Sequence, residues 1–301
     1  MKRPAPGAQA DAMAALAESL AVLLDAGLTP RSAWAAVAEH GGHPIAALVT
    51  ASLSAQPSCA HALREAAESD DVRAVAAAWQ VAEDAGAPLG HTLRVVAETV
   101  RDVAEAEREA EVALSGPRAT ARLVSWLPLA GVALAAALGA DIVGAASSAP
   151  GAVALGAGGM LMLAGRWWMC GLLRQALVSR QTPGLREELI ALALAGGAST
   201  AASVDAADRA TRAAGLRPQG EDGARKILRI AESAGAPAVE LLTASARQLR
   251  RTARANARRA AATLGVRLML PLGVCVLPSF LLLAVAPLVL SLLASTTAGL
   301  R

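Results

Sequence analysis

The sequence predicts an all-α integral membrane protein built from two duplicated cytoplasmic helical-bundle modules and three transmembrane helices. The run AEDAGAP at residues 82–88 returns as AESAGAP at residues 231–237, an offset of 149 residues. Each copy leads into a long apolar stretch. Hydrophobic residues make up 54% of the 301-residue chain and its mean hydropathy is +0.44, which is rare in a soluble globular chain. An internal repeat of this kind governs the expected architecture.

Residue types favour helices over strands. The chain has one Phe, no Tyr and five Trp, and runs with the alternation of a strand are hard to find. Ala, Leu, Val and Gly take their place, which favours helices that pack through small residues. Cys59, Cys170 and Cys275 are far apart in the sequence, and we interpret them as small buried residues rather than as disulfides or metal ligands.

Three stretches are long and apolar enough to span a membrane. Eighteen residues without a charge separate Arg122 from Asp141, 24 more separate Asp141 from Arg166, and no charge occurs from Leu268 to Leu300. A helix needs about 20 apolar residues to cross the hydrocarbon core. We therefore place spans at 121–141, 150–172 and 268–295. Three prolines predict bends in the third span: Pro271, Pro278 and Pro287.

The distribution of arginine predicts the orientation of these spans. The connection from Asp141 to Pro150 carries no Lys or Arg, whereas the opposite flanks carry Arg118, Arg122, Arg174, Arg180, Arg258, Arg259 and Arg267. The positive-inside rule then places the N-terminus and both modules in the cytoplasm and the C-terminus outside the cell membrane. Arg166 lies beside Trp167 and Trp168, which fits a side chain that reaches the interface from the end of a span.

The expected domains follow from these spans. Residues 1–11 are a disordered N-terminus, 12–117 the first module, 118–173 two membrane helices with a short extracytoplasmic loop, 174–266 the second module, and 267–301 the C-terminal membrane helix. In the first module, the apolar helix through Leu24 ends at Gly27, and Thr29-Pro30 starts the next helix. The same ending follows Leu194 at an offset of 170, so the second module is 21 residues shorter between its two motifs.

Several of these segments resemble the type II secretion system F-domain family. The resemblance depends on LLDAGLTPRSAW at residues 23–34, on AEDAGAPLGHTLRVVAETVR at 82–101, and on a Glu-x-x-Gly step that occurs as Glu83/Gly86 and again as Glu232/Gly235. The stretches at 113–129 and 263–273 are similar to the TadB/TadC branch of actinobacteria, which belongs to tight-adherence (Flp) pilus systems. The resemblance covers about residues 12–295.

What the resemblance implies is an inner-membrane platform protein for type IV/Flp (Tad) pilus assembly or type II-like secretion. Its implied partners are a cytoplasmic secretion or pilus ATPase, pilins, a second platform protein of the TadB/TadC type and the lipid bilayer, in a homo- or hetero-oligomer. We expect no nucleic acid partner. The alternative is the membrane subunit of an ATP-driven transporter, a permease, which would show ionisable groups along a path through its spans.

No motif for catalysis is found. Lys226 lies in GEDGARKI, which lacks the Gly-Lys-Ser/Thr ending of a phosphate-binding loop, so energy has to come from a partner. His40 and His43 have the spacing of two metal ligands but no third ligand nearby. LGAD at residues 138–141 lacks the first glycine and the second aspartate of membrane aspartyl peptidases. We therefore predict a protein that is not an enzyme and has no cofactor and no metal.

The two long helices that follow the repeated motif differ in charge at matched positions. At the offset of 149, Glu98, Asp102, Glu105 and Glu109 correspond to Arg247, Arg251, Arg254 and Arg258. Spacings of 4, 3 and 4 put each set on one helix face. Either both faces are solvated, with the basic face attracted to anionic lipid headgroups, or the two stripes pair within a chain or between protomers and set the register of an assembly.

Overall fold

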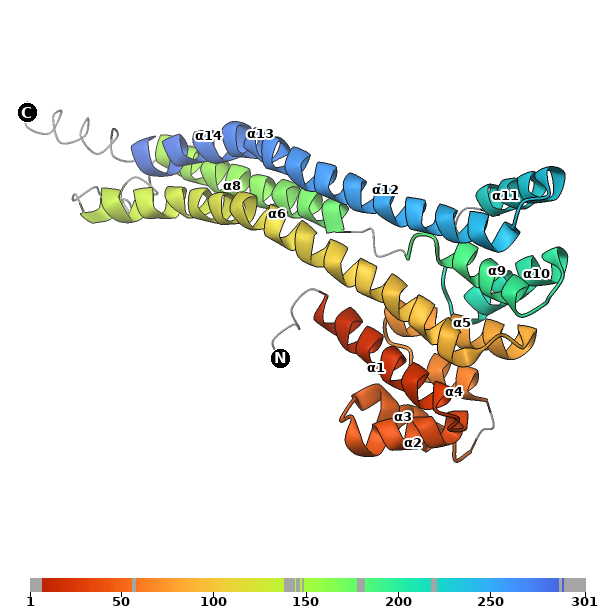
Figure 1. Cartoon of the computed structure of the whole chain (residues 1–301). Coiled ribbons are helices and arrows are strands. Elements are labelled where there is room, and N and C mark those ends of the chain that lie inside the picture. The colour runs from red at the N-terminus through yellow and green to blue at the C-terminus, as the bar shows by residue number, and fades with distance from the viewer. Residues whose placement is uncertain are drawn as a thin grey trace, which may run out of the picture. The chain divides into compact units, whose positions relative to one another are not determined.

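The computed structural model describes residues 7–55, 58–137, 149–177, 182–217 and 221–286, together with the single residues 144, 147 and 289. In this part of the chain every regular element is a helix (Figure 1), as the sequence predicts. The chain divides into two compact units. Unit 1 combines a first segment, residues 1–109, with a second segment, residues 180–256, and unit 2 combines residues 110–179 with residues 257–301.

The two segments of unit 1 have helices in a matching order. The first segment contains α1 (Ala8–Asp25), α2 (Pro30–His40), α3 (Pro44–Ser52), α4 (Cys59–Glu65), α5 (Asp70–Ala85) and the start of α6 (Leu89–Ala137). The second contains α9 (Leu185–Ala195), α10 (Thr200–Ala213), α11 (Glu221–Ala234) and most of α12 (Ala238–Arg267). In the first segment α3 and α4 lie between α2 and α5, whereas in the second segment α11 is the next helix after α10. These two additional helices account for the 21-residue difference in length.

The turn after the first helix has the same geometry in both segments. Gly27 has φ of 90° and Gly197 has φ of 92°, a left-handed conformation that glycine adopts without steric cost. The following amide donates five residues back in each case, from Leu28 to Leu23 over 3.1 Å and from Ala198 to Ala193 over 3.2 Å. The next helix then begins with a hydroxyl cap, supplied by Thr29 on α2 and by Ser199 on α10.

The repeated AE-x-AGAP motif also forms the same turn twice. Gly86 has φ of 68° and Gly235 has φ of 63°. The amide of Ala87 donates to the carbonyl of Ala82 over 3.0 Å, and the amide of Ala236 donates to that of Ala231 over the same distance. A left-handed glycine therefore ends the helix before each of the two long helices, α6 and α12.

Both segments of unit 1 contribute to one hydrophobic core. The fully buried rings of Trp34 and Trp79 lie in its first-segment part with centroids 5.8 Å apart. Helix α5 packs against α9 and α10 of the second segment (Figure 1). The segments expected to form two modules therefore share their apolar interior within a single unit.

The start of α1 differs from the expected disordered segment 1–11. The helix begins at Ala8. Gly7 precedes it in a left-handed conformation, with φ of 76°, and its amide donates to the Glu107 carboxylate on α6 over 3.0 Å. This long-range bond fixes the first turn, a contact that the local sequence does not reveal. Residues 1–6 lie outside the described part of the chain.

Unit 2 packs three helical stretches through small residues. Helix α8 (Ala149–Leu177) lies alongside the end of α6 and the helix that continues α12 (Figure 1). A Cβ atom at Gly131 of α6 would come within 2.7 Å of the Phe280 ring, and one at Gly165 of α8 would come within 2.9 Å of Cys275. The hydroxyl of Ser279 donates to the carbonyl of Gly158 over 2.9 Å. Close approach of this kind is typical of membrane helices.

The last described helix changes its winding near two of its prolines. After α13 (Met269–Pro271) follow η1 (Leu272–Val276), α14 (Leu277–Phe280) and η2 (Leu281–Val285), of which η1 and η2 are wider π-helical turns. Proline has no amide hydrogen, so the regular backbone bond is lost there and the helix readjusts locally. Pro287 lies outside the described residues, as does most of the predicted loop at 141–150.

Two described helices are long and apolar enough to cross a membrane: Leu89–Ala137 and the continuous helix Ala238–Val285. Only 17% of the most apolar stretch of the first and 33% of that of the second are buried, so neither is a core helix covered by the rest of the protein. The remaining expected span, 150–172, lies on α8, which does not meet the same test. The membrane span at 150–172 therefore stays a prediction.

Replacing Gly235 by Ala tests the repeated turn. A side chain in the left-handed region costs about 1–2 kcal/mol, so we expect G235A to lower the unfolding midpoint of the full-length protein in detergent. The matched control is G223A, which changes a glycine inside α11 with nothing closer than 3.9 Å to the added methyl and should leave the midpoint unchanged or raise it. Fluorescence of the buried Trp34 and Trp79 reports unfolding. Equal midpoints for the two variants would contradict the role of the turn.

Candidate functional site

Helix α1 is joined to α6 by three ion pairs at a spacing of seven residues. The pairs are Asp11 with Arg108, Glu18 with Arg101, and Asp25 with Arg94. Residue numbers rise along α1 as they fall along α6, so the two helices are antiparallel. A seven-residue spacing returns each charge to nearly the same helix face. This ladder was not predicted from the sequence, although the regular spacing of opposite charges at these six positions could have revealed it.

The predicted stripes meet within one chain at their centre. Arg254 of α12 lies 3.2 Å from the Oδ1 atom of Asp102 on α6 and also pairs with Glu105. Its Nη2 donates in addition to the backbone carbonyl of Asp102 over 3.2 Å. Glu105 and Arg254 are the residues that correspond at the offset of 149. Equivalent positions of two copies contact each other where a two-fold axis passes between them.

The adjacent arginine, Arg250, is buried and compensated by two carboxylates. Its Nη2 donates to Glu188 of α9 over 3.0 Å, with the two side chains only 6% and 4% exposed. Its Nη1 donates to the buried hydroxyl of Thr99 over 3.2 Å. Its Nε lies 3.1 Å from Asp102 but is not aligned for a hydrogen bond. Arg250 thus joins α12 to both α6 and α9.

This buried pair repeats an exposed pair of the first segment. Glu188 corresponds to Glu18 at the offset of 170, and Arg250 corresponds to Arg101 at the offset of 149. The two environments shift the pKa of the glutamate in opposite directions. The hydrogen bond from Arg101 lowers the pKa of Glu18, whereas burial raises the pKa of Glu188 against the opposing effect of Arg250. The offset of 149 therefore relates the two arginines, whereas their acidic partners are related by the different offset of 170.

The outer members of the stripes differ in exposure and in the unit that contains them. Glu98, Arg247 and Arg251 are exposed on unit 1. Glu109 belongs to unit 1 and Arg258 to unit 2. The pairing between the stripes includes Asp102, Glu105 and Arg254, and Arg250, Glu188 and Thr99 adjoin it. Glu109 and Arg258 each make a polar or electrostatic interaction as well. Whether this cluster sets the register of an assembly stays a prediction.

The repeated Glu-x-x-Gly step differs in the contacts of its acid. Glu83 accepts a hydrogen bond of 2.7 Å from the indole of Trp79, whereas Glu232 is exposed and the residue in the place of Trp79 is Leu228. His40 ends α2, and His43 caps α3 by accepting from the amide of Ile45 over 3.3 Å. In the described part of the chain, no three His, Cys, Asp or Glu side chains gather where they could hold a metal ion.

In unit 2 the apolar stretches of all three helical segments end in one layer. Ala121 of α6, Met169 of α8 and Leu268 after α12 belong to the same buried cluster. Each has an arginine within one helical turn that closes its apolar stretch: Arg122, Arg166 and Arg267. Charged side chains at one level on three helices are typical of the border between hydrocarbon and headgroups.

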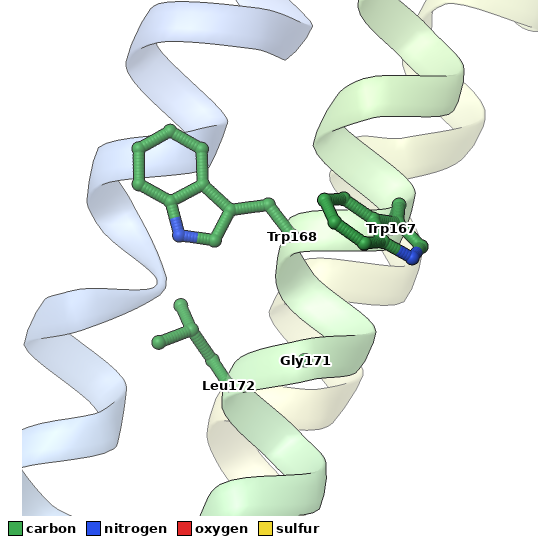
Figure 2. Close-up of a pocket in the computed structure, with 4 residues that line it drawn as sticks. All are labelled: Trp167, Trp168, Gly171 and Leu172. Atoms are coloured by element: carbon green, nitrogen blue, oxygen red, sulfur yellow. The ribbon is translucent and has the colours of Figure 1, made fainter.

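An open hollow of about 340 Å³ adjoins this layer on α8. It is lined by Trp167, Trp168, Gly171 and Leu172. Figure 2 shows that Trp168 and Leu172 point toward the neighbouring C-terminal helix, whereas the Trp167 ring lies over α8 itself. Trp167 is 83% exposed and Trp168 is 44% exposed. Exposed indoles at such a level are typical of a membrane interface.

The fold and these two sites define an all-helical protein with a charged helical bundle and an apolar unit with the surface of a membrane anchor. Residues 16–136 match the family model for type II secretion system (T2SS), protein F. The match runs from α1 to the end of α6 and supports the family resemblance over the first copy of the repeat. The searches of curated proteins and of solved structures found no match.

Removing Arg250 should destabilise unit 1 far more than removing Arg254. R250A leaves Glu188 buried without its partner, and breaking a buried pair on one side costs about 3–5 kcal/mol. R254A removes partly exposed contacts, which are worth about 0–1 kcal/mol. The measurement is the unfolding midpoint of each full-length variant in detergent. The paired replacement Glu188→Gln with Arg250→Met should recover part of the loss, and similar midpoints for R250A and R254A would show that the buried pair is not decisive.

Proposed function

We propose that this protein is an inner-membrane platform protein for assembly of a type IV/Flp (Tad) pilus or for type II-like secretion. The observation that carries the proposal is the match of residues 16–136 to the type II secretion system protein F family. That match covers α1 from residue 16 onward, α2 to α5, and the first predicted span as far as residue 136. The stretches at 113–129 and 263–273 favour the TadB/TadC branch of actinobacteria within it.

The surface of unit 2 supports a membrane location for such a platform. Leu123 is 77% exposed and Met269 is 70% exposed, and similar side chains cover the outer faces of the same helices. A soluble protein rarely exposes apolar patches of this extent. Lipid would cover them, with the layer of Arg122, Arg166 and Arg267 at the cytoplasmic border.

The long helices support a role in transmitting movement. Helix α6 runs for 49 residues without a break, and its residues belong to unit 1 before Ala110 and to unit 2 after it. A continuous helix is stiff along its axis, so a force applied to one part of α6 reaches the other. In the proposed role, a cytoplasmic ATPase acts on unit 1, and unit 2 passes the displacement to pilins within the membrane.

The alternative function is a permease subunit of an ATP-driven transporter. Such a subunit would line a path with ionisable or strongly polar groups. In the described residues of the predicted spans, the buried hydroxyl of Ser279 bonds to a backbone carbonyl, and the arginines lie at the ends of the apolar stretches. This arrangement favours an anchor that packs helix against helix.

Deletion of the gene in its own organism tests the proposal. We expect loss of surface filaments, or of filament-dependent secretion, with recovery when the wild-type chain is supplied. A113P, which breaks α6 at an exposed position near the border of the units, should insert in the membrane but fail to restore filaments. A113S is the matched control and should restore them. Normal filaments in the deletion strain would refute the platform role, and loss of solute uptake with normal filaments would favour the permease.

The predicted number of spans can be tested with reporters fused to the C-terminus. Three spans with a cytoplasmic N-terminus place the C-terminus outside, so fused alkaline phosphatase should be active and fused green fluorescent protein should be dark. Fusions after Ala213, within the second segment, should give the opposite pattern. A fluorescent C-terminal fusion would indicate an even number of spans, and active alkaline phosphatase after Ala213 in addition would exclude α8 as a membrane helix.

A further inference from the structure

Helix α5 of the first segment covers a face of the second segment. It packs against α9 and α10 (Figure 1), and a Cβ atom at Gly196, which follows α9, would come within 2.5 Å of the carbonyl oxygen of Ala85 at the end of α5. Residues spaced by four, three and four share a helix face with each of these two contacts: Ala74, Ala78, Val81 and Ala85 on α5, and Leu185, Leu189, Leu192 and Gly196 on α9. The first three members of each stripe are buried.

The equivalent residues of the repeat are exposed. The offset of 149 relates the α5 stripe to an α11 stripe, and the offset of 170 relates the α9 stripe to an α1 stripe: Gly223, Ile227, Ile230 and Ala234 on α11, and Ala15, Ser19, Val22 and Ala26 on α1. Seven of these eight residues are exposed and Ile227 is half-buried. Ile230 is 48% exposed and Val22 is 61% exposed, whereas their counterparts Val81 and Leu192 are 0% and 4% exposed. The described part of unit 1 thus makes one of two equivalent contacts and leaves the other unmade.

The α11 and α1 stripes complement each other in size. In the contact made within the chain, the small side chains of α5 meet the leucines of α9. The exposed pair exchanges the large and small positions, because α11 has two isoleucines and α1 has only alanine, serine and valine, so the two can pack to a similar total volume. The methyl group of Ala26 stands in the place of Gly196 and makes this end of the contact wider. Ser19 donates to the carbonyl of Ala15 over 2.9 Å, so its hydroxyl stays satisfied when covered.

The two stripes belong to segments of opposite net charge. The first segment of unit 1 contains 15 acidic and 8 basic side chains, whereas the second contains 8 acidic and 12 basic ones. Exposed Lys226 and Arg229 are sequence neighbours of the α11 stripe, and Asp25 is a neighbour of the α1 stripe. A first segment therefore attracts the second segment of another molecule, whereas two first segments repel each other.

We propose that the α11 stripe of one molecule docks on the α1 stripe of a second copy of this chain, in the way that α5 docks on α9 within the chain. Each chain has one stripe of each kind, so the interface joins two different surfaces. Contacts of this type add copies in one direction, in a ring if the rotation closes and in an open chain if it does not. The proposal concerns unit 1 and does not rest on a role in filament assembly.

Cross-linking between two differently tagged full-length chains tests this contact. A26C and A234C place thiols at the positions equivalent to the Gly196 and Ala85 contact, and C170A removes the exposed native thiol. The two purified variants are mixed in detergent and treated with a short thiol-specific cross-linker. We expect products that carry both tags, which only a contact between molecules can form.

Leu48 provides the matched control for cross-linking. It is 57% exposed on α3, a helix without an equivalent in the second segment, so L48C mixed with A234C should give only the background of random collisions. A26C alone should also give background, because the proposed interface joins unlike surfaces. Equal yields from the A26C and L48C mixtures with A234C would overturn the contact. Products from A26C alone at the yield of the mixture would replace it by a two-fold contact of α1 with α1.

The strength of association then assigns the contact to the α11 stripe. I230A removes a side chain of which about half is left to be covered, so self-association measured by sedimentation equilibrium in detergent should weaken about tenfold. L48A removes a similarly exposed side chain and should leave it unchanged. Equal association of I230A and wild type, or equal weakening by L48A, would refute the docking surface. The filament phenotype of the deletion strain is a separate measurement, so the platform role and this interface can fail independently.

Discussion

The contacts of Arg250 are the constraint on which the arrangement of unit 1 depends. One guanidinium on α12 reaches Glu188 on α9, and Thr99 and Asp102 on α6. A buried charge is costly unless it is paired and hydrogen-bonded, so these three helices can pack only in a geometry that brings both carboxylates to Arg250. The shared apolar core supplies most of the stability, because burial of apolar surface is the main driving force of folding. The charge cluster selects one packing among those that would bury a similar area.

The two segments of unit 1 show how a repeated interaction changes with its surroundings. Glu18 and Arg101 are almost half exposed, and two further ion pairs flank them along α1. The corresponding Glu188 and Arg250 are buried, and the residues that would flank them in α9 and α12 include Ala195 and Thr243, which carry no charge. Helix α9 is also seven residues shorter than α1. An exposed ladder of weak pairs in one segment has its counterpart in a single buried pair in the other, where water no longer screens it.

Most of the helices, but only part of the ionic cluster, can be predicted from the sequence. Gly27, Gly86 and the threonine cap at Thr29 act locally, so their turns could be predicted from their own segments. Glu105 and Arg254 were found because one offset relates them. Glu188 and Arg250 were missed as a pair because α3 and α4 separate the two offsets, and because burial depends on helices that no local pattern connects. The start of α1 at Ala8 was missed for the same reason, since Glu107 fixes it from a distance of 100 residues.

At positions 105 and 254, the reversal of charge between α6 and α12 matches the contact that the two helices make. Glu105 and Arg254 occupy equivalent positions of the repeat and touch each other, as residues near a two-fold axis do. In a chain with two identical copies, a glutamate at position 254 would face Glu105 and also Asp102, and like charges at this distance repel. Arginine at 254 turns that repulsion into attraction, while Arg101 and Arg250 keep the same charge because each faces an acid on the first helix of its own segment. At positions 105 and 254 a contact with the other copy thus accompanies a reversal of charge. The arginine at positions 101 and 250 is retained together with an acid on the first helix of its own segment, although Arg250 also contacts Asp102 and Thr99 of the other copy.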